Sequence, residues 1–216
     1  MKQQFWLDCW KNTRLGFHQD ELQPLMVEHF PNLVKASDNR IFVPLCGKTA
    51  DMLFFAERFK VIGNELSGIA CHDFFADNKL VAKVKKSNGF SIFAQGNIEL
   101  HQGDFFALDG KQFQPFDWIY DRAAIIAFPE DMRNEYVQQL KNFMTAATRI
   151  FLLTLEFPED EMQGPPFSVK EDEVRQLFKG YKVIKQAERD LTGQKFARLT
   201  LPLSSIQETL YIISSE

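Results

Sequence analysis

Apolar and polar positions alternate along the chain in two patterns, which together predict an α/β fold. Short, continuous apolar runs are typical of buried strands. Runs of this kind lie at 40–45, 60–66, 116–122 and 148–157. Between the first two and directly after the second, apolar residues recur every three or four positions, which predicts helices over 49–59 and 67–78. Strand and helix with short links indicate right-handed crossovers over a parallel sheet.

The remaining segments extend this sheet. Two β-rich runs separated by Gln95-Gly96-Asn97 predict a hairpin, or else a strand preceded by an insertion. Residues 181–190 and 208–215 predict two closing, antiparallel strands. Ser168, with Glu171 three residues later, has the spacing of a capping box at the start of a helix. We therefore expect about seven strands in a mostly parallel sheet with helices on both faces, formed by a single domain over residues 1–216.

Composition narrows the class of protein. Hydrophobic residues make up 45% of the 216 residues, and the formal net charge is −4 with no basic block, so we expect no nucleic-acid partner. No apolar run reaches the roughly 18 residues of a membrane span, and residues 1–14 lack the apolar core of a signal peptide. Three widely spaced cysteines argue against a disulfide framework. We expect a cytoplasmic protein with no membrane partner and no bound metal, and a monomer by default.

The turn after the first strand ends in Gly47-Lys48-Thr49, as a phosphate-binding loop would. Such a loop needs a glycine five residues before Gly47, and that position is Phe42. Glu65 lies about 20 residues after Leu45, at the end of the second predicted strand. In α/β nucleotide-binding folds an acidic residue at this position accepts hydrogen bonds from ribose hydroxyls. A solvated charge, or a cap for the helix that begins near Ser67, is the alternative for Glu65.

The ligand that fits this turn is a nucleoside without phosphates. A dinucleotide site requires several glycines, whereas this turn has Gly47 alone, with Pro44 and Leu45 before it. S-adenosylmethionine has the ribose diol but no phosphate. Asp104 follows a later strand and is placed to accept from an adenine amino group, with Phe105 packing on the ring. Asp104 as a turn carboxylate and Phe105 as a core side chain are the alternatives.

Six segments resemble, in this order, those of the thiopurine S-methyltransferases in their shorter bacterial form. They read "FWLDCWKNTRLGFHQ", "VPLCGKTADM", "IGNELS", "QGDFF", "WIYDRAA" and "GPPF", and the resemblance runs from about residue 5 to the C-terminus. It implies the class I S-adenosylmethionine-dependent methyltransferase fold, with S-adenosylmethionine as methyl donor. Asn64 departs from the family pattern, which has an apolar residue there, and the C-terminal third matches less well.

The resemblance also implies roles for individual residues. Trp10, Leu45 and Glu65 correspond to cofactor contacts, and Phe17 resembles the family's aromatic wall beside cofactor and substrate. Arg122 resembles the family's active-site arginine, with expected contacts to the acceptor and to the cofactor. Residues 1–30 are expected to form an N-terminal helical lid.

The expected reaction is direct, in-line methyl transfer to an aromatic or heterocyclic thiol such as a thiopurine. Arg122 is the expected catalytic residue, because a fixed positive charge stabilises an anionic sulfur nucleophile. The alternatives are methylation of selenium or tellurium compounds, nicotinamide-dependent oxidation, and binding of a nucleoside-type ligand without catalysis.

Overall fold

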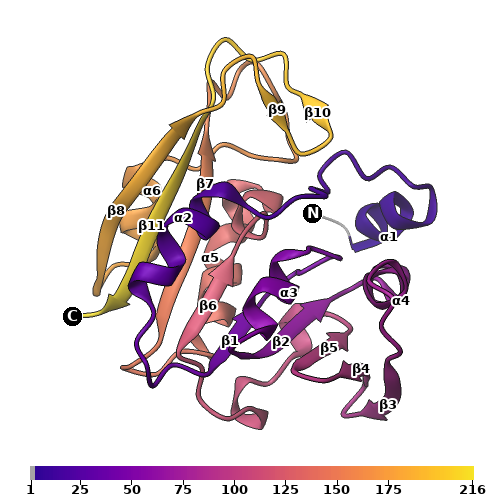
Figure 1. Ribbon diagram of the computed structural model, residues 1–216. Helices are drawn as coiled ribbons and strands as arrows, with labels where there is room; N and C mark the ends of the chain where they lie inside the picture. The colour runs from indigo at the N-terminus through magenta and orange to yellow at the C-terminus, as the bar shows by residue number, and fades with distance from the viewer. Residues whose placement is uncertain (1–2) are drawn as a thin grey trace. The chain divides into compact units, whose positions relative to one another are not determined.

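The computed structural model describes residues 3–216, so the first two residues of the expected lid lie outside the described part. The described residues fall into two compact units, one up to Asp109 and the other from Gly110 to Glu216. Figure 1 labels the helices and strands of both units.

The first unit alternates helices and strands. Its elements are α1 (Gln3–Lys11), α2 (Pro24–Leu33), β1 (Arg40–Val43), α3 (Asp51–Ala56), β2 (Lys60–Glu65), α4 (Gly68–Asp77), β3 (Lys83–Ser87), β4 (Phe90–Gln95), β5 (Ile98–Gln102) and the 3-10 helix η1 (Phe105–Ala107). The strands are ordered β3-β4-β5-β2-β1. β1 pairs with β2, and β2 with β5, in parallel, while β4 is antiparallel to both of its neighbours.

The direction of the crossovers explains how the helices of this unit are placed. The chain steps from β1 to β2 and from β2 toward β5 in the same direction across the sheet. Right-handed crossovers therefore bring α3 and α4 to the same face. α2 packs on α3, where the Phe30 ring lies 4.9 Å from the Phe55 ring and 5.7 Å from the Phe59 ring. α1 lies beside α4 (Figure 1).

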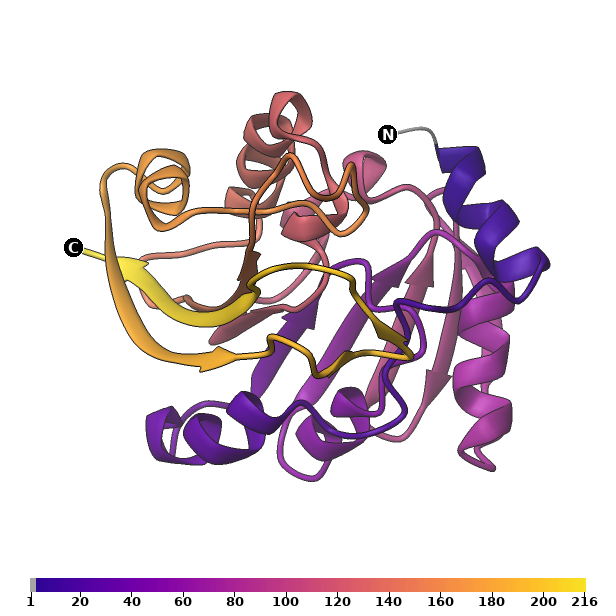
Figure 2. The same cartoon turned by 90° about the horizontal axis from the view of Figure 1, so that it is seen from above.

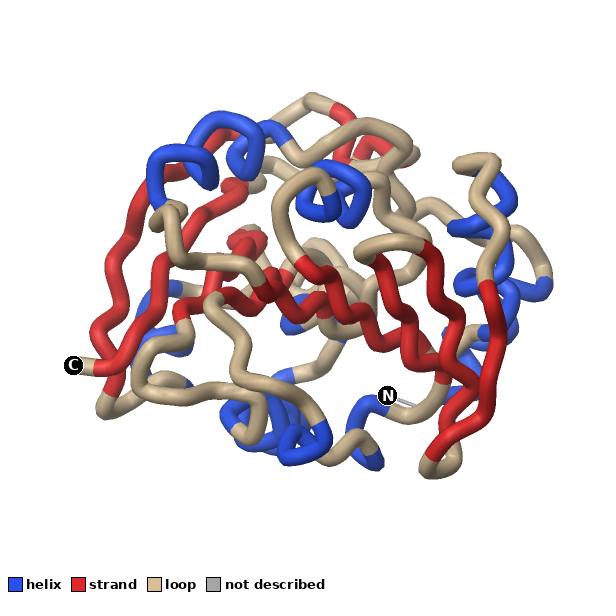
Figure 3. Tube along the Cα trace, turned by 60° about the horizontal axis from the view of Figure 1, so that its bottom comes forward, coloured by secondary structure: helices blue, strands red, loops and turns tan. Residues whose placement is uncertain are grey.

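The second unit completes the strand pattern. Its elements are the 3-10 helix η2 (Gly110–Gln112), β6 (Trp118–Asp121), the 3-10 helix η3 (Ile125–Ala127), α5 (Glu130–Lys141), β7 (Arg149–Glu156), α6 (Glu171–Leu177), β8 (Tyr181–Asp190), β9 (Lys195–Phe196), β10 (Leu199–Thr200) and β11 (Gln207–Ser215). The order is β6-β7-β11-β8, with β6 and β7 parallel and β11 antiparallel to both neighbours. The segment between β8 and β11 carries the small β9–β10 ribbon (Figure 2), and β8 and β11 run side by side near the C-terminus (Figure 3).

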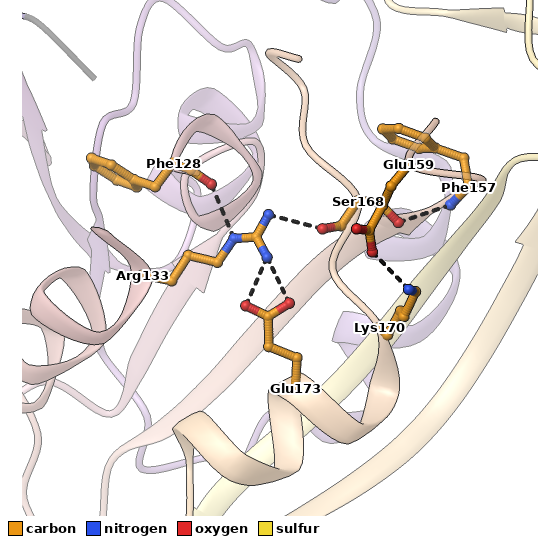
Figure 4. A network of polar contacts seen from close by, with 7 residues as sticks. All are labelled: Phe128, Arg133, Phe157, Glu159, Ser168, Lys170 and Glu173. Atoms are coloured by element: carbon orange, nitrogen blue, oxygen red, sulfur yellow. Dashed lines mark hydrogen bonds and ion pairs between the residues drawn. The ribbon is translucent and has the colours of Figure 1, made fainter. Parts of the chain in front are cut away.

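A buried arginine joins several segments of the second unit (Figure 4). Arg133 on α5 is 3% exposed and donates to the carbonyl oxygens of Phe128 (3.0 Å) and Ser168 (2.8 Å). It also donates to both carboxylate oxygens of Glu173 on α6, at 2.7 and 2.6 Å. Because the guanidinium group has five N–H donors in a rigid plane, one side chain holds the ends of two loops and a helix together.

The same region corrects the predicted helix cap. Ser168 does not cap α6, which begins after Lys170 without a side-chain cap. Its hydroxyl instead accepts from the backbone N–H of Phe157 at 3.0 Å (Figure 4). The capping-box spacing misleads here because the serine side chain closes the loop after β7 instead.

The expected strands are all present, including the hairpin of β4 and β5 and the two antiparallel closing strands. The structure adds β3, β9 and β10, which the apolar pattern does not predict, since every residue of β3 is exposed and the other two strands are very short. Among residues 3–216, no helix has both the length and the apolar character needed to span a bilayer.

Candidate active site

Glu65 ties together the turn after β1 and the start of α4. Glu65 is the last residue of β2 and is 6% exposed. The backbone N–H of Gly47 donates to Oε2 at 2.9 Å, and that of Ser67 donates to Oε1 at 2.7 Å. Ser67 itself caps α4 through its hydroxyl, as the sequence predicts. The carboxylate therefore bridges two neighbouring strand ends in place of standing free in solvent.

The carboxylate retains capacity to accept from a ligand. It offers about four lone-pair sites; the N–H groups of Gly47 and Ser67 occupy one on each oxygen, and the Leu66 N–H is a third, weaker donor. The hydroxyl groups of a vicinal diol are donors that suit the remaining acceptor capacity. Burial raises the pKa of Glu65 to about 7, while the backbone hydrogen bonds from Ser67, Gly47 and Leu66 act in the opposite direction. Near neutral pH the Glu65 carboxyl group is therefore close to its pKa. Hydrogen-bond donors of a bound ligand would shift it toward the ionised form.

The turn between β1 and α3 has a backbone suited to close ligand approach. Leu45 and Gly47 both take the left-handed conformation, with φ of 48° and 53°. Lys48 forms an ion pair with Asp77 at the end of α4, with 2.7 Å between Nζ and Oδ2. Its ammonium group is therefore engaged within the protein, which agrees with the sequence argument against a phosphate-binding loop.

Aromatic side chains of the N-terminal segment gather at this turn. Trp10 on α1 is 4% exposed, and a Cβ atom placed on Gly47 would lie only 3.3 Å from its indole ring. The half-buried Phe17 meets Trp10 edge to face, with ring centroids 5.7 Å apart, and meets Trp6 in the same way at 5.4 Å. Trp10, Phe17, Leu45 and Glu65 thus fall in one neighbourhood of the first unit.

Asp104 and Phe105 follow β5. Asp104 caps η1 by accepting from the backbone N–H of Phe106 at 3.0 Å, so the turn-carboxylate role is present, and further acceptor capacity remains. Phe105 is 4% exposed and stacks on Phe42 of β1, with centroids 6.4 Å apart. Its neighbour Phe106 is half-buried and is the more accessible of the two rings.

Asn64 links the turn after β5, which carries Asp104, to the end of β2, which carries Glu65. The pattern of the sequence does not reveal this role. It is 1% exposed, and its amide donates to the carbonyl oxygens of His101 (3.0 Å) and Gly103 (3.2 Å). The Gly103 N–H in turn donates to the Glu65 carbonyl at 2.9 Å. The polar residue that departs from the family pattern therefore fastens the end of β2 to the turn that carries Asp104.

Arg122 belongs to the second unit, where it follows β6 and is half-buried. The preceding Asp121 is fully buried, so the two residues are not a surface ion pair. Asp121 accepts from the Tyr136 hydroxyl at 2.6 Å and from the Ile125 N–H at 3.1 Å. Burial raises the pKa of Asp121 to about 6, against the lowering effect of these hydrogen bonds.

Tyr136 is a second residue that sequence reasoning misses. It lies mid-helix in α5, at a position that the apolar periodicity explains equally well as plain core. A tyrosine 15 residues after a strand-end aspartate is a weak signal, because nothing in the pattern shows that its hydroxyl faces that aspartate.

Comparison with known proteins agrees with this geometry. The model of the family described as thiopurine S-methyltransferase (TPMT) matches residues 1–216. A thiopurine S-methyltransferase of Photobacterium profundum is 38% identical, with 99% of each chain covered. One from Pseudomonas fluorescens is 35% identical over 100% of this chain and 98% of its own.

Solved structures share the fold at low sequence identity. A methyltransferase from Anabaena variabilis, described as SAM-dependent, superposes with a TM-score of 0.73 at 12% identity, covering 99% of this chain and 95% of its own. The magnesium protoporphyrin IX methyltransferase of Synechocystis, solved with S-adenosylhomocysteine (SAH) bound, gives 0.64 at 12% identity and covers 99% of both chains.

The fold of this chain is thus that of the class I S-adenosylmethionine-dependent methyltransferases. Within that class, the chain belongs to the thiopurine S-methyltransferase family. It is an enzyme that transfers the methyl group of S-adenosylmethionine to sulfur.

Proposed function

We propose that the acceptor is an aromatic or heterocyclic thiol such as a thiopurine. The observation that carries this proposal is the match of the whole chain to the thiopurine S-methyltransferase family. Relatives of this name match over nearly full length, so the resemblance is not confined to the part of the chain expected to bind the cofactor.

The cofactor is proposed to bind to the first unit. There Glu65 accepts from the two ribose hydroxyls, which its remaining lone pairs support. Trp10 and Leu45 lie beside Gly47 and supply contacts to the rest of the donor. Asp104 accepts from the adenine amino group, with Phe105 behind the ring as a buried support.

The acceptor side is proposed to involve Phe17 and Arg122. Phe17 offers a half-buried aromatic edge to a flat ring. The Arg122 guanidinium, in the second unit, is proposed to stabilise the anionic thiolate or thione. A thiopurine loses its proton readily, so a strong base is not required.

When bound, S-adenosylmethionine supplies a methyl group already activated by the positive sulfonium. The acceptor sulfur donates its electron pair to that carbon as the carbon–sulfonium bond breaks, and SAH leaves. The protein's task is to align the reacting atoms, and such alignment can lower the barrier by roughly 7 to 11 kcal/mol.

The test is a methyl-acceptor screen with radiolabelled S-adenosylmethionine. The panel contains 6-mercaptopurine, thiophenol, their oxygen counterparts hypoxanthine and phenol, and selenite and tellurite. We expect label on the two sulfur acceptors and little on the oxygen counterparts. Label on the selenium or tellurium compounds alone, or on none of the panel, contradicts the proposal.

Arg122→Ala and Arg122→Lys separate charge from geometry. We expect the alanine variant to reduce turnover far more than SAH affinity, and the lysine variant to recover part of it. Turnover at the wild-type level in Arg122→Ala removes the role proposed for this residue.

A further inference from the structure

We propose that Tyr136, acting through Asp121, is a positioning residue that holds the backbone of Arg122 in place for methyl transfer. The proposal rests on the acceptor role proposed above for Arg122. The residues concerned all belong to the second unit and come from the end of β6 and from α5.

The Asp121 carboxylate closes a small ring of chain around Arg122. Its Oδ1 accepts from the Ile125 N–H four residues later, at 3.1 Å, and the Ala124 N–H also donates to the carboxylate. Arg122 therefore lies in the chain between Asp121, whose carboxylate accepts, and Ala124 and Ile125, whose N–H groups donate. The direction in which its side chain leaves the backbone depends on these hydrogen bonds.

The conformation of the next residue shows that the turn needs such support. Ala123 has φ of 59°, in the left-handed region, which is unfavourable for a residue with a Cβ atom. A strained conformation of this kind persists where the surroundings hold it. Without the carboxylate that fixes the following N–H groups, the turn has a lower-energy alternative, and Arg122 would move with it.

Tyr136 in turn fixes the carboxylate. Its hydroxyl donates to Asp121 Oδ2 at 2.6 Å, and the tyrosine is fully buried. Its ring stacks on Phe128, with centroids 4.9 Å apart, and the Phe128 carbonyl accepts from Arg133 (Figure 4). Residues 121–128 are thus attached to α5 at both ends, by Tyr136 at the start and by Arg133 at the finish.

The charge of Asp121 matters to this arrangement. The groups that face the carboxylate are the Tyr136 hydroxyl from α5 and the N–H groups of Ala124 and Ile125. All of them donate, so the ionised form satisfies them best, whereas burial raises the pKa to about 6. Loss of the Tyr136 hydroxyl would raise that pKa further, because it removes a hydrogen bond to the charged form.

The test variant is Tyr136→Phe, assayed with 6-mercaptopurine across pH 5.5 to 9. We expect kcat to fall about 10- to 100-fold near neutral pH, as expected for a displacement of about 1 Å, with SAH affinity unchanged. The acid limb of the kcat profile should move to higher pH. Asp121→Asn should retain an acceptor for Ile125 without titrating, and should flatten the acid limb.

Tyr211→Phe is the matched control. Tyr211 is a second buried tyrosine of the same unit, on β11, whose hydroxyl interacts with Thr209. Removing its hydroxyl should lower the melting temperature without moving the pH profile. A Tyr136→Phe enzyme that is folded by circular dichroism and has wild-type kcat and pH profile overturns the proposal.

A double-mutant cycle separates this proposal from the proposed function. If Tyr136 acts through Arg122, Tyr136→Phe should cost little further turnover once Arg122 is alanine. Fully additive effects in an active enzyme contradict the positioning role alone. A wild-type enzyme that methylates no thiol contradicts the proposed function, and the positioning role with it.

Discussion

A single carboxyl group, that of Glu65, connects the strand ends of the first unit and is the proposed anchor of the cofactor ribose. Both of its oxygens already accept backbone N–H groups, so its orientation is set before any ligand binds. Such preorganisation reduces the entropy that binding would otherwise cost. Its raised pKa, about 7, makes the strength of the anchor depend on pH in the neutral range.

We predict that Glu65→Gln weakens SAH binding about 10- to 100-fold at pH 8, because an amide has one acceptor oxygen and cannot accept from both the backbone N–H groups and the ribose hydroxyls. Isothermal titration calorimetry measures the effect. Wild-type affinity should also increase from pH 6 to 8 with release of a proton, since donors bound to the carboxylate lower its pKa.

The control for this prediction is Glu57→Gln, which changes an exposed carboxylate at the end of α3 in the same unit. It should leave both affinity and proton release unchanged. If Glu65→Gln binds SAH as the wild type does, Glu65 does not contact the ribose.

At the scale of elements, Asn64 fastens the end of β2, which carries Glu65, to the turn after β5, which carries Asp104. Its amide reaches the carbonyls of His101 and Gly103 from the end of β2. Only glycine fits at position 103, because its φ is 156° and a Cβ atom there would lie 2.6 Å from the Phe90 ring. The spacing between Glu65 and Asp104 is therefore set by the ends of β2 and β5.

We predict that Asn64→Leu lowers SAH affinity about 5- to 30-fold and also lowers the melting temperature, since the carbonyl groups of His101 and Gly103 lose a donor. Fluorescence titration and thermal denaturation give the two quantities. Asn97→Leu is the comparison, because Asn97 makes a similar bond, to the Ala56 carbonyl at 3.0 Å, just before β5 begins. Equal losses of affinity in both variants would exclude a local positioning effect.

The sequence predicts the elements well wherever burial produces a pattern. β1, β2, β6 and β7 are buried on most positions and read as apolar runs. β3 is a lysine-rich edge strand, exposed throughout, so its sequence has no buried face to show.

For the candidate site, strand-end positions could be predicted, but partners could not. Glu65 was expected at the end of its strand, and the structure places it there. The bonds that Asn64 and Tyr136 make depend on residues 37 and 15 positions away, and no local pattern records such distances. The proposed roles of Trp10, Leu45, Asp104, Phe105 and Arg122 remain predictions.

At the scale of the whole molecule, two buried carboxyl groups affect stability in the neutral pH range. Glu65 and Asp121 have pKa values raised to about 7 and about 6 from ordinary values of 4.5 and 3.8. Between about pH 4 and 7 the folded protein retains protons that the unfolded chain has released. Their stabilising contribution is complete below the unfolded pKa values and is lost as pH rises through 6 and 7.

We predict that the free energy of unfolding of the ligand-free enzyme decreases from pH 5 to 8, by on the order of 2 kcal/mol for each of these groups. Urea denaturation at each pH measures it. Glu65→Gln should flatten the curve near pH 7, and Asp121→Asn near pH 6. Carboxyl groups with a lowered pKa, such as Glu99, change the free energy of unfolding at lower pH, below this range. A stability that increases over this range would contradict the prediction.

The burial of the cysteines has a consequence for an enzyme that methylates sulfur. Cys9, Cys46 and Cys71 are all buried, and burial raises the pKa of each thiol. A neutral, enclosed thiol is a poor nucleophile. Cys46 directly follows Leu45 in the turn proposed to hold the methyl donor, and we therefore expect its burial to protect this thiol from methylation by the enzyme itself.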